Sequence, residues 1–204
     1  MSSDDAPRHT TGSLATVIAT VVAGLVIGVG SAWLWLTKTD PAGLRVCPWL
    51  LNLEAGSIDA PLYTRARIAI KALLALDRRE TLYYIADHDD AGRPLRAQCR
   101  YLISGSIPAA RWWSVTAYAD DIFLFPNPDK KYSISGENPT GRTAGSFRMV
   151  TGPTPPPTGG IEWVPTPGDG GLILTLRLYN PMPELQTDPG ALAAPSIQLQ
   201  GDCT

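Results

Sequence analysis

An uncharged segment over residues 13–36 limits what this chain can fold into more than any other feature of its sequence. At about 1.5 Å per residue, its 24 residues make a helix of roughly 36 Å, enough to cross a hydrocarbon core of about 30 Å. Trp33 and Trp35 lie near its C-terminal end, where aromatic side chains gather at membrane interfaces. The segment therefore predicts a transmembrane helix over residues 13–36.

Two other kinds of helix are also apolar, the core helix of a globular protein and the cleaved signal peptide. A core helix rarely continues for so long without a polar stripe. A signal peptide has a shorter apolar region and small residues at its cleavage site, whereas Trp and Leu occupy that position here. We therefore predict an uncleaved signal-anchor, preceded by a cytoplasmic tail over residues 1–12.

The charges beside this segment do not decide its orientation, because Arg8 precedes it while Lys38 and Arg45 follow it. All three cysteines lie after the segment, which favours an oxidising compartment for that part of the chain. We predict a single-pass protein of the inner (cytoplasmic) membrane whose C-terminal domain is periplasmic.

Small residues recur at every fourth position of the segment and so share one face of the helix. Gly24 and Gly28 form a GxxxG pair, which lets two helix backbones approach closely in lipid. Gly and Ala are also common in membrane helices that have no partner. We predict a helix-partner face at Thr20, Gly24 and Gly28, which would contact another membrane helix or a second copy of the chain.

The rest of the chain has the composition of an ordinary globular domain. Without the segment, charged residues make up 36 of 180, or 20% (17 + 19 of 204 − 24). This content of charged and apolar residues excludes intrinsic disorder for most of the domain. The net charge of −2 offers no electrostatic footprint for nucleic acid.

The domain is predicted to be mainly β. Residues 37–58 are expected to form an irregular juxtamembrane connector, and apolar residues at helical spacing predict one amphipathic helix from about 60 to 77. Alternating leucines make 172–179 the clearest strand. We expect an antiparallel β-sandwich or jelly-roll over residues 59–204. Its predicted strands are 81–86, 100–104, 112–118, 122–125, 132–135, 147–150, 161–164, 172–179 and 196–200.

Three blocks of sequence, at residues 111–118, 124–134 and 174–181, resemble the bacterial family called domain of unknown function 1214. Their shared pattern is W-S-x-T-x-Y, then P-N-P followed by Y-S, then L-T-L-R-L-Y-x-P. The resemblance covers about residues 77–201 and implies a jelly-roll sandwich without an established activity. Lys131 is a departure, because many relatives have Arg there, and Lys offers only a point charge.

The resemblance also implies a partner. Longer relatives carry a second domain, domain of unknown function 1254, ahead of this one. Here an apolar segment takes its place, as in a short membrane-anchored branch of the family. That branch implies a separate partner protein that carries the missing domain.

The chain has few groups suited to catalysis. Its histidines are His9 and His88, and no serine has a G-x-S-x-G setting. The acidic run at residues 87–90 could ligate a metal, but Asp is also a standard turn residue, and a solvated turn is the favoured interpretation. We predict no catalytic residue, no metal and no cofactor.

Some polar and aromatic side chains could line a sugar- or anion-binding face, although packing in the core or at a sheet edge is the alternative role of each. The candidates are Trp112, Tyr118, Asn127, Tyr132, Arg148 and Arg177. The function we expect is a membrane-anchored periplasmic binding or assembly module that works with an envelope partner. The alternative is an envelope hydrolase acting on a carbohydrate or a phosphorylated small molecule.

The cysteines allow three pairings with a single bridge. Cys99 begins a predicted strand and Cys203 follows the last one, so a disulfide between them would attach the chain end to the sheet. We predict this pairing, which leaves Cys47 free.

Overall fold

The structure is a computed structural model that describes residues 13–38, 43–70, 75–137, 142–143, 145–157 and 159–203. The chain divides into two compact units, Met1–Asp40 and Pro41–Thr204. Each unit is described by itself.

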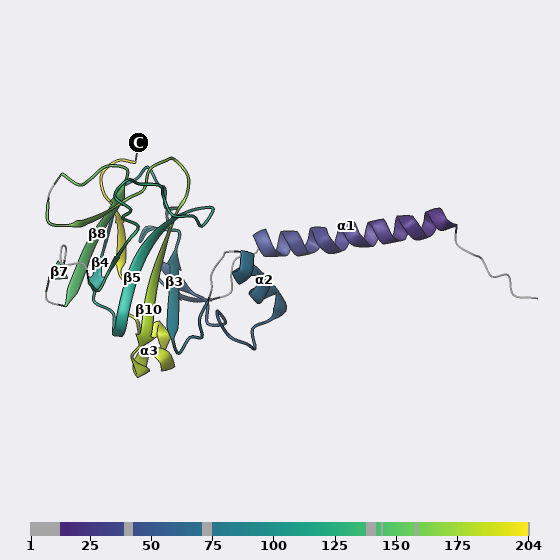
Figure 1. Cartoon of the computed structure of the whole chain (residues 1–204), viewed down its shortest axis with the longest axis horizontal. Helices are drawn as coiled ribbons and strands as arrows, with labels where there is room; N and C mark the ends of the chain where they lie inside the picture. The colour runs from purple at the N-terminus through teal and green to yellow at the C-terminus, as the bar shows by residue number, and fades with distance from the viewer. Residues whose placement is uncertain are drawn as a thin grey trace, which may run out of the picture. The chain divides into compact units, whose positions relative to one another are not determined.

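The first unit contains one helix, α1 (Leu14–Lys38), in the part of it that the structure describes (Figure 1). The stretch Leu14–Trp35 has the length and composition to cross a membrane, and none of it is buried. The hydroxyl of Thr20 donates a hydrogen bond to the carbonyl of Thr16 within the helix, at 2.9 Å. The predicted apolar helix is therefore confirmed as an exposed N-terminal helix, a feature of signal sequences and of anchors alike.

The second unit is built from two β-sheets that pack together (Figure 1). In the six-stranded sheet every neighbouring pair is antiparallel. Its strands, in spatial order, are β1 (Leu44–Val46), β2 (Trp49–Leu51), β3 (Thr81–Ala86), β10 (Leu172–Pro181), β5 (Ala110–Ala119) and β6 (Ser133–Ser135).

The other sheet is mixed rather than wholly antiparallel as predicted. Its antiparallel strands, in order, are β11 (Ser196–Leu199), β4 (Tyr101–Ser106), β8 (Ser146–Gly152) and β7 (Arg142–Thr143). The strand β9 (Glu162–Pro165) pairs with β8 in parallel, because the chain returns to the starting end of β8 before β9 begins. A two-sheet, mostly β fold is confirmed, and the jelly-roll connectivity stays a prediction.

The core lies between the sheets. Alternate leucines of β10 point into it, as the period of two predicts, and all four are buried. Trp113 of β5 meets Phe147 of β8 with ring centroids 4.5 Å apart, so aromatic packing joins the two sheets. Buried Trp49 donates its indole N–H to the carbonyl of Pro195 at 2.7 Å, which removes the cost of burying that polar group.

The segment before β3 differs most from expectation. The stretch predicted as a connector contains β1 and β2, which extend the six-stranded sheet from β3. The predicted helix is observed as α2 (Leu62–Ile70), and the chain is not helical at residues 75–77, while residues 71–74 lie outside the described part. α2 contributes no residue to the described core, because its first apolar side chains face solvent. Two short elements after β10 were not predicted, α3 (Pro183–Thr187) and the 3-10 helix η1 (Pro189–Ala191).

Candidate binding surface

Arg177 lies on the outward face of β10, between Tyr83 of β3 and Ser114 of β5. Its Nη2 donates to the hydroxyl of Tyr118 at 2.9 Å, and its Nη1 donates to Oγ1 of Thr116 at 3.2 Å. Its Cζ also lies over the Tyr118 ring, 5.4 Å from the centroid. These contacts hold the half-buried guanidinium in one place along β5.

The charge of Arg177 has no acidic neighbour in the part of the chain that the structure describes. Among the residues that the structure describes, the ion pairs join other side chains, and no carboxylate lies within 4.0 Å of this guanidinium. A guanidinium has five N–H donors in a planar fork that matches a carboxylate or phosphate. Arg177 is therefore suited to receive an anionic group from outside the domain.

Aromatic side chains stand beside Arg177 on the same outward face. Trp112 of β5 and Tyr179 of β10 pack with ring centroids 5.0 Å apart, and Trp112 is partly exposed. Burial raises the pKa of Tyr179 above its ordinary value, although the charge of Arg177 acts against this shift, so Tyr179 presents a neutral hydroxyl at pH 7. We call this set the Arg177 face: Trp112, Thr116, Tyr118, Arg177 and Tyr179.

Three of the six predicted ligand-binding residues, Trp112, Tyr118 and Arg177, come together on this face. Tyr179 was missed as a site residue, although its alternation with Arg177 along the strand places both on one side of the sheet. Thr116 was missed too, and the same alternation along β5 places it beside Tyr118.

The other three predicted residues lie elsewhere. Asn127 uses its side chain inside its own loop, donating to the carbonyls of Phe125 and Lys131 and accepting from the Lys131 N–H. Tyr132 directly precedes β6, and its carbonyl accepts from the backbone of β5. Arg148 is exposed on β8 in the other sheet, so Arg148 and Arg177 do not converge on a common anion.

A buried ion pair joins the two sheets. Glu162 at the start of β9 is only 5% exposed, and its Oε2 lies 2.5 Å from Nζ of Lys131, just before β6. The sequence drew attention to Lys131 but not to Glu162, because residues 31 positions apart carry no local signal of contact. This pair stabilises the fold rather than adding a free charge to the surface.

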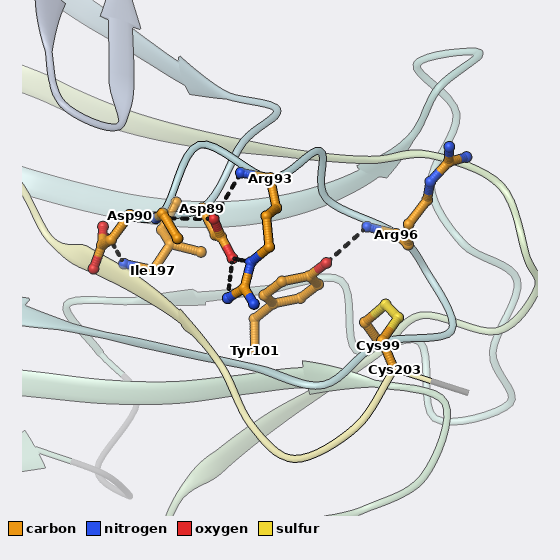
Figure 2. Close-up of polar contacts among 9 residues, drawn as sticks. Asp89, Asp90, Arg93, Arg96, Cys99, Tyr101, Ile197 and Cys203 are labelled. Carbon is orange, nitrogen blue, oxygen red and sulfur yellow. Dashed lines mark hydrogen bonds and ion pairs between the residues drawn. A yellow bond between two sulfur atoms is a disulfide. The ribbon is translucent and has the colours of Figure 1, made fainter.

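The acidic run at residues 87–90 forms a turn, as predicted, but the prediction that the turn is solvated is wrong for Asp89, which is buried (Figure 2). Asp89 is 2% exposed and accepts from the backbone N–H groups of Ala91 and Arg93 at 3.0 and 2.9 Å and from Nε of Arg93 at 2.8 Å. Burial acts to raise the pKa of Asp89, but these hydrogen bonds and the Arg93 charge together lower it below its ordinary value. Within the described residues no group of three or more His, Cys, Asp or Glu is placed to hold a metal.

The neighbourhood of this turn is tied to the C-terminal part of the domain (Figure 2). Asp90 accepts from the backbone N–H of Ile197 at 3.0 Å, and the Tyr101 hydroxyl accepts from the backbone N–H of Arg96, also at 3.0 Å. The predicted disulfide between Cys99 and Cys203 is confirmed, and Cys47 is an exposed free thiol. The disulfide supports an extracytoplasmic location for the domain.

A pocket of about 480 Å³ lies apart from the Arg177 face. The loop before α2 and the turn before β3 line it, with acidic and basic groups mixed along its walls. It includes none of the predicted binding residues. Its charged lining residues are Glu54, Asp59, Asp77, Arg78 and Arg79.

A solved structure of another protein shows a similar fold. The VPA0106 protein from Vibrio parahaemolyticus is similar in structure, with a TM-score of 0.55 and 18% identity over 96% of this chain and 48% of that one. The chain thus spans about half the length of that protein. A putative uncharacterized protein from Burkholderia cenocepacia matches with a TM-score of 0.44 and 14% identity, over 59% of this chain and 29% of that one.

No match was found among curated proteins. The profile of the family described as "Protein of unknown function (DUF1214)" matches residues 80–183, which are 104 of the 204 residues (183 − 80 + 1). The matched range contains β5 and β10, the strands that carry the Arg177 face. The chain belongs to the DUF1214 family.

Proposed function

We propose that this protein is a single-pass, membrane-anchored binding module of the cell envelope that recognises a partner protein through the Arg177 face. The exposed apolar helix α1 supports an uncleaved anchor in the inner membrane. The Cys99–Cys203 disulfide supports a periplasmic location for the domain, which would have the jelly-roll connectivity that the family resemblance implies.

The observation that carries this proposal is the half-buried Arg177 guanidinium, which has no carboxylate neighbour among the described residues and lies next to Trp112 and Tyr179. Trp, Tyr and Arg are the residues that most often dominate binding energy at protein interfaces. The face lies on the outward side of the six-stranded sheet, and none of its residues lines the pocket of about 480 Å³, which suits a protein surface better than a small substrate. An acidic side chain of the partner would pair with Arg177 while the aromatic rings pack around it.

The family resemblance names one candidate partner, a protein that carries domain of unknown function 1254. A second contact would come from α1, where Thr20, Gly24 and Gly28 offer small side chains to another membrane helix or to a second copy. The alternative of an envelope hydrolase gains no support from a shared anion site, because Arg148 and Arg177 lie on different sheets.

Site-specific photo-crosslinking in intact membranes tests the proposal. A photoreactive phenylalanine analogue replaces Trp112 or Tyr179, and the matched control position is Gln198, exposed on β11 of the other sheet. We expect one crosslinked protein from both test positions and none from Gln198, and we expect Arg177→Gln to reduce its yield at least tenfold. Equal crosslinking at all three positions, or a yield that Arg177→Gln leaves unchanged, would contradict the proposal.

A further inference from the structure

The pocket of about 480 Å³ is formed where two segments of the second unit come close together. One wall is the loop at residues 53–60, and the other is the turn at residues 77–79. Gly56 of the loop has a φ of +77°, and a Cβ atom there would collide with the carbonyl oxygen of Leu76. Glycine is therefore required for this close approach of the loop to the turn. We call the cavity the loop–turn pocket.

Hydrogen bonds and burial hold both walls in place. The loop wall is attached to α2, because Thr64 donates to Oε2 of Glu54 at 3.0 Å. Ala60, where the loop wall ends, is buried in the domain. The turn wall directly follows Leu76, whose backbone N–H donates to the Tyr83 hydroxyl of β3 at 3.1 Å. The shape of the pocket is therefore set by the fold of the domain.

The two walls carry net charges of opposite sign. Glu54 and Asp59 are the charged residues of the loop wall, which gives it a net charge of −2. The turn wall has Arg78 and Arg79 against Asp77, a net charge of +1 (2 − 1). Asp77 also accepts a hydrogen bond from the backbone N–H of Arg79 at 2.9 Å, within its own turn. The charges nearly cancel over the whole pocket, but they are separated between its walls.

The opposite charges do not pair with one another across the pocket. The ion pairs in the part of the chain that the structure describes lie elsewhere, and none includes a charged residue of either wall. A ligand with a single charge would be attracted by one wall and repelled by the other. A ligand with one charge of each sign would be attracted by both walls, so the arrangement selects for a zwitterion.

Apolar side chains accompany these charges. Leu53 and Ile58 line the loop wall, and Ile58 is 89% exposed, more than any other large apolar residue described in the second unit. The volume of the pocket is within the range of about 300–1,000 Å³ that is typical of small-molecule sites. Its lining therefore suits a small ligand that has an apolar part as well as two charges.

We propose that the loop–turn pocket binds a small zwitterion with an apolar side chain, either a free α-amino acid or a short peptide. The ammonium group of the ligand pairs with the acidic loop wall, and its carboxylate pairs with the two arginines of the turn wall. Its side chain packs against Leu53 and Ile58. This site shares no residue with the Arg177 face and does not require α1 to be an anchor, so it is independent of the proposed function.

Saturation-transfer difference NMR of the full-length chain in a nonionic detergent tests this proposal. The probes are leucine and the dipeptide alanyl-leucine. The dipeptide is also used with its amino end acetylated, with its carboxyl end amidated, and with both ends blocked. Each block removes one charge and keeps the apolar side chain. Micelles without protein give the reference signal.

We expect the free dipeptide to bind, and each single block to raise its dissociation constant about fivefold, as for ion pairs open to solvent. The double change Arg78→Gln with Arg79→Gln should weaken the free dipeptide as much as amidation does and should leave the effect of acetylation. Glu54→Gln with Asp59→Asn should show the reverse pattern. The matched control Arg148→Gln, on the other sheet, should change nothing.

Three results would overturn the proposal. They are a signal no greater than that of empty micelles for both probes, equal binding of the free and doubly blocked dipeptides, and an equal effect of Arg148→Gln and the wall variants. Tighter binding of leucine would assign the pocket to a free amino acid, and tighter binding of alanyl-leucine would assign it to a peptide. Both of these results support a zwitterion site.

Discussion

Asp89 and Glu162 are both buried carboxylates, but different kinds of neighbour compensate their charges. Asp89 is held by backbone N–H groups and by Arg93, four residues away, within one turn. Glu162 is paired with Lys131, which lies across the sandwich on the segment before β6. A local network can form with the turn itself, whereas the Lys131–Glu162 pair exists only when both sheets are assembled.

The charges of Asp89 and Glu162 stabilise the fold, whereas the charge of Arg177 does not have this role. Both carboxylates have a cation close by, so their charges stabilise the folded domain. Arg177 lacks a carboxylate neighbour among the described residues, so its charge is left for another molecule. The predictions below separate these three cases, from the largest expected effect on stability to the smallest.

The largest effect is expected from the disulfide between Cys99 and Cys203. Changing Cys99 and Cys203 to Ser opens a loop with a sequence separation of 104 and should lower the free energy of unfolding by about 4 kcal/mol. Denaturant unfolding of the full chain in detergent, followed by tryptophan fluorescence, measures this. Cys47→Ser is the matched control and should change little, and a similar loss in both variants would refute the assignment.

Lys131→Met should break the non-local pair. The buried carboxylate of Glu162 then loses its contact with the Lys131 ammonium, which we expect to cost about 2–3 kcal/mol, because Lys131 itself is partly exposed. The double variant Lys131→Met with Glu162→Leu should regain most of this loss, because no charge is left buried. If the double variant is as unstable as the single one in the same denaturant assay, the pair does not act as a unit.

Asp89→Asn should have a smaller effect, because two backbone donors can still bond the amide oxygen. We expect a loss of about 2 kcal/mol, the typical value for hydrogen bonds to a charged group. The pKa of Asp89 is lower in the folded state, so its charge stabilises the fold above the unfolded pKa of about 3.9. This contribution is lost as pH falls through the folded pKa.

A pH series therefore measures how much the charge of Asp89 contributes to stability. The difference in unfolding free energy between wild type and Asp89→Asn should be constant from pH 7 to about 5 and should shrink below about pH 4. Arg93→Gln should reduce the same difference, since it removes one cause of the lowered pKa. A difference that grows on acidification would show that the sign of the Asp89 contribution is wrong.

Arg177→Gln should have the smallest effect on stability, about 1 kcal/mol, because it removes two hydrogen bonds and the cation–π contact with Tyr118 from a partly exposed side chain. The same change should abolish most photo-crosslinking from Trp112. Arg177→Lys keeps the charge without the planar fork and should retain an intermediate yield. A loss of several kcal/mol on Arg177→Gln would assign Arg177 to the fold instead.

Local patterns predicted the parts of this molecule whose contacts are local. The alternation in β10, the apolar helix α1 and the turn around Asp89 all follow from neighbouring residues. The period of two also explains why Trp112, Tyr118 and Arg177, three of the predicted binding residues, lie on the outward side of their strands; their binding role stays a prediction.

Non-local pairing explains what the sequence did not reveal. The strands β1 and β2 are three residues each, too short for a periodic signal, and they are strands because β1 pairs with β2 and β2 pairs with β3. Apolar spacing led us to expect that α2 would continue to residue 77. This spacing cannot show whether the apolar face is buried in the core, and without such burial a long helix is not stabilised. Glu162 contacts Lys131 because the two sheets pack together, and no local pattern around residue 162 predicts that contact.

The hairpin of β1 and β2 has a mechanical consequence. In a chain anchored by α1, tension between the membrane and the domain acts first on β1, an edge strand bonded only to β2 along three residue pairs. The load peels these pairs one after another, starting at Leu44 and Leu51, while β2 stays bonded to β3. Release of β1 would lengthen the chain between α1 and the domain by roughly 10 Å, at about 3.3 Å per residue. The hairpin would then open under load before the two sheets unfold.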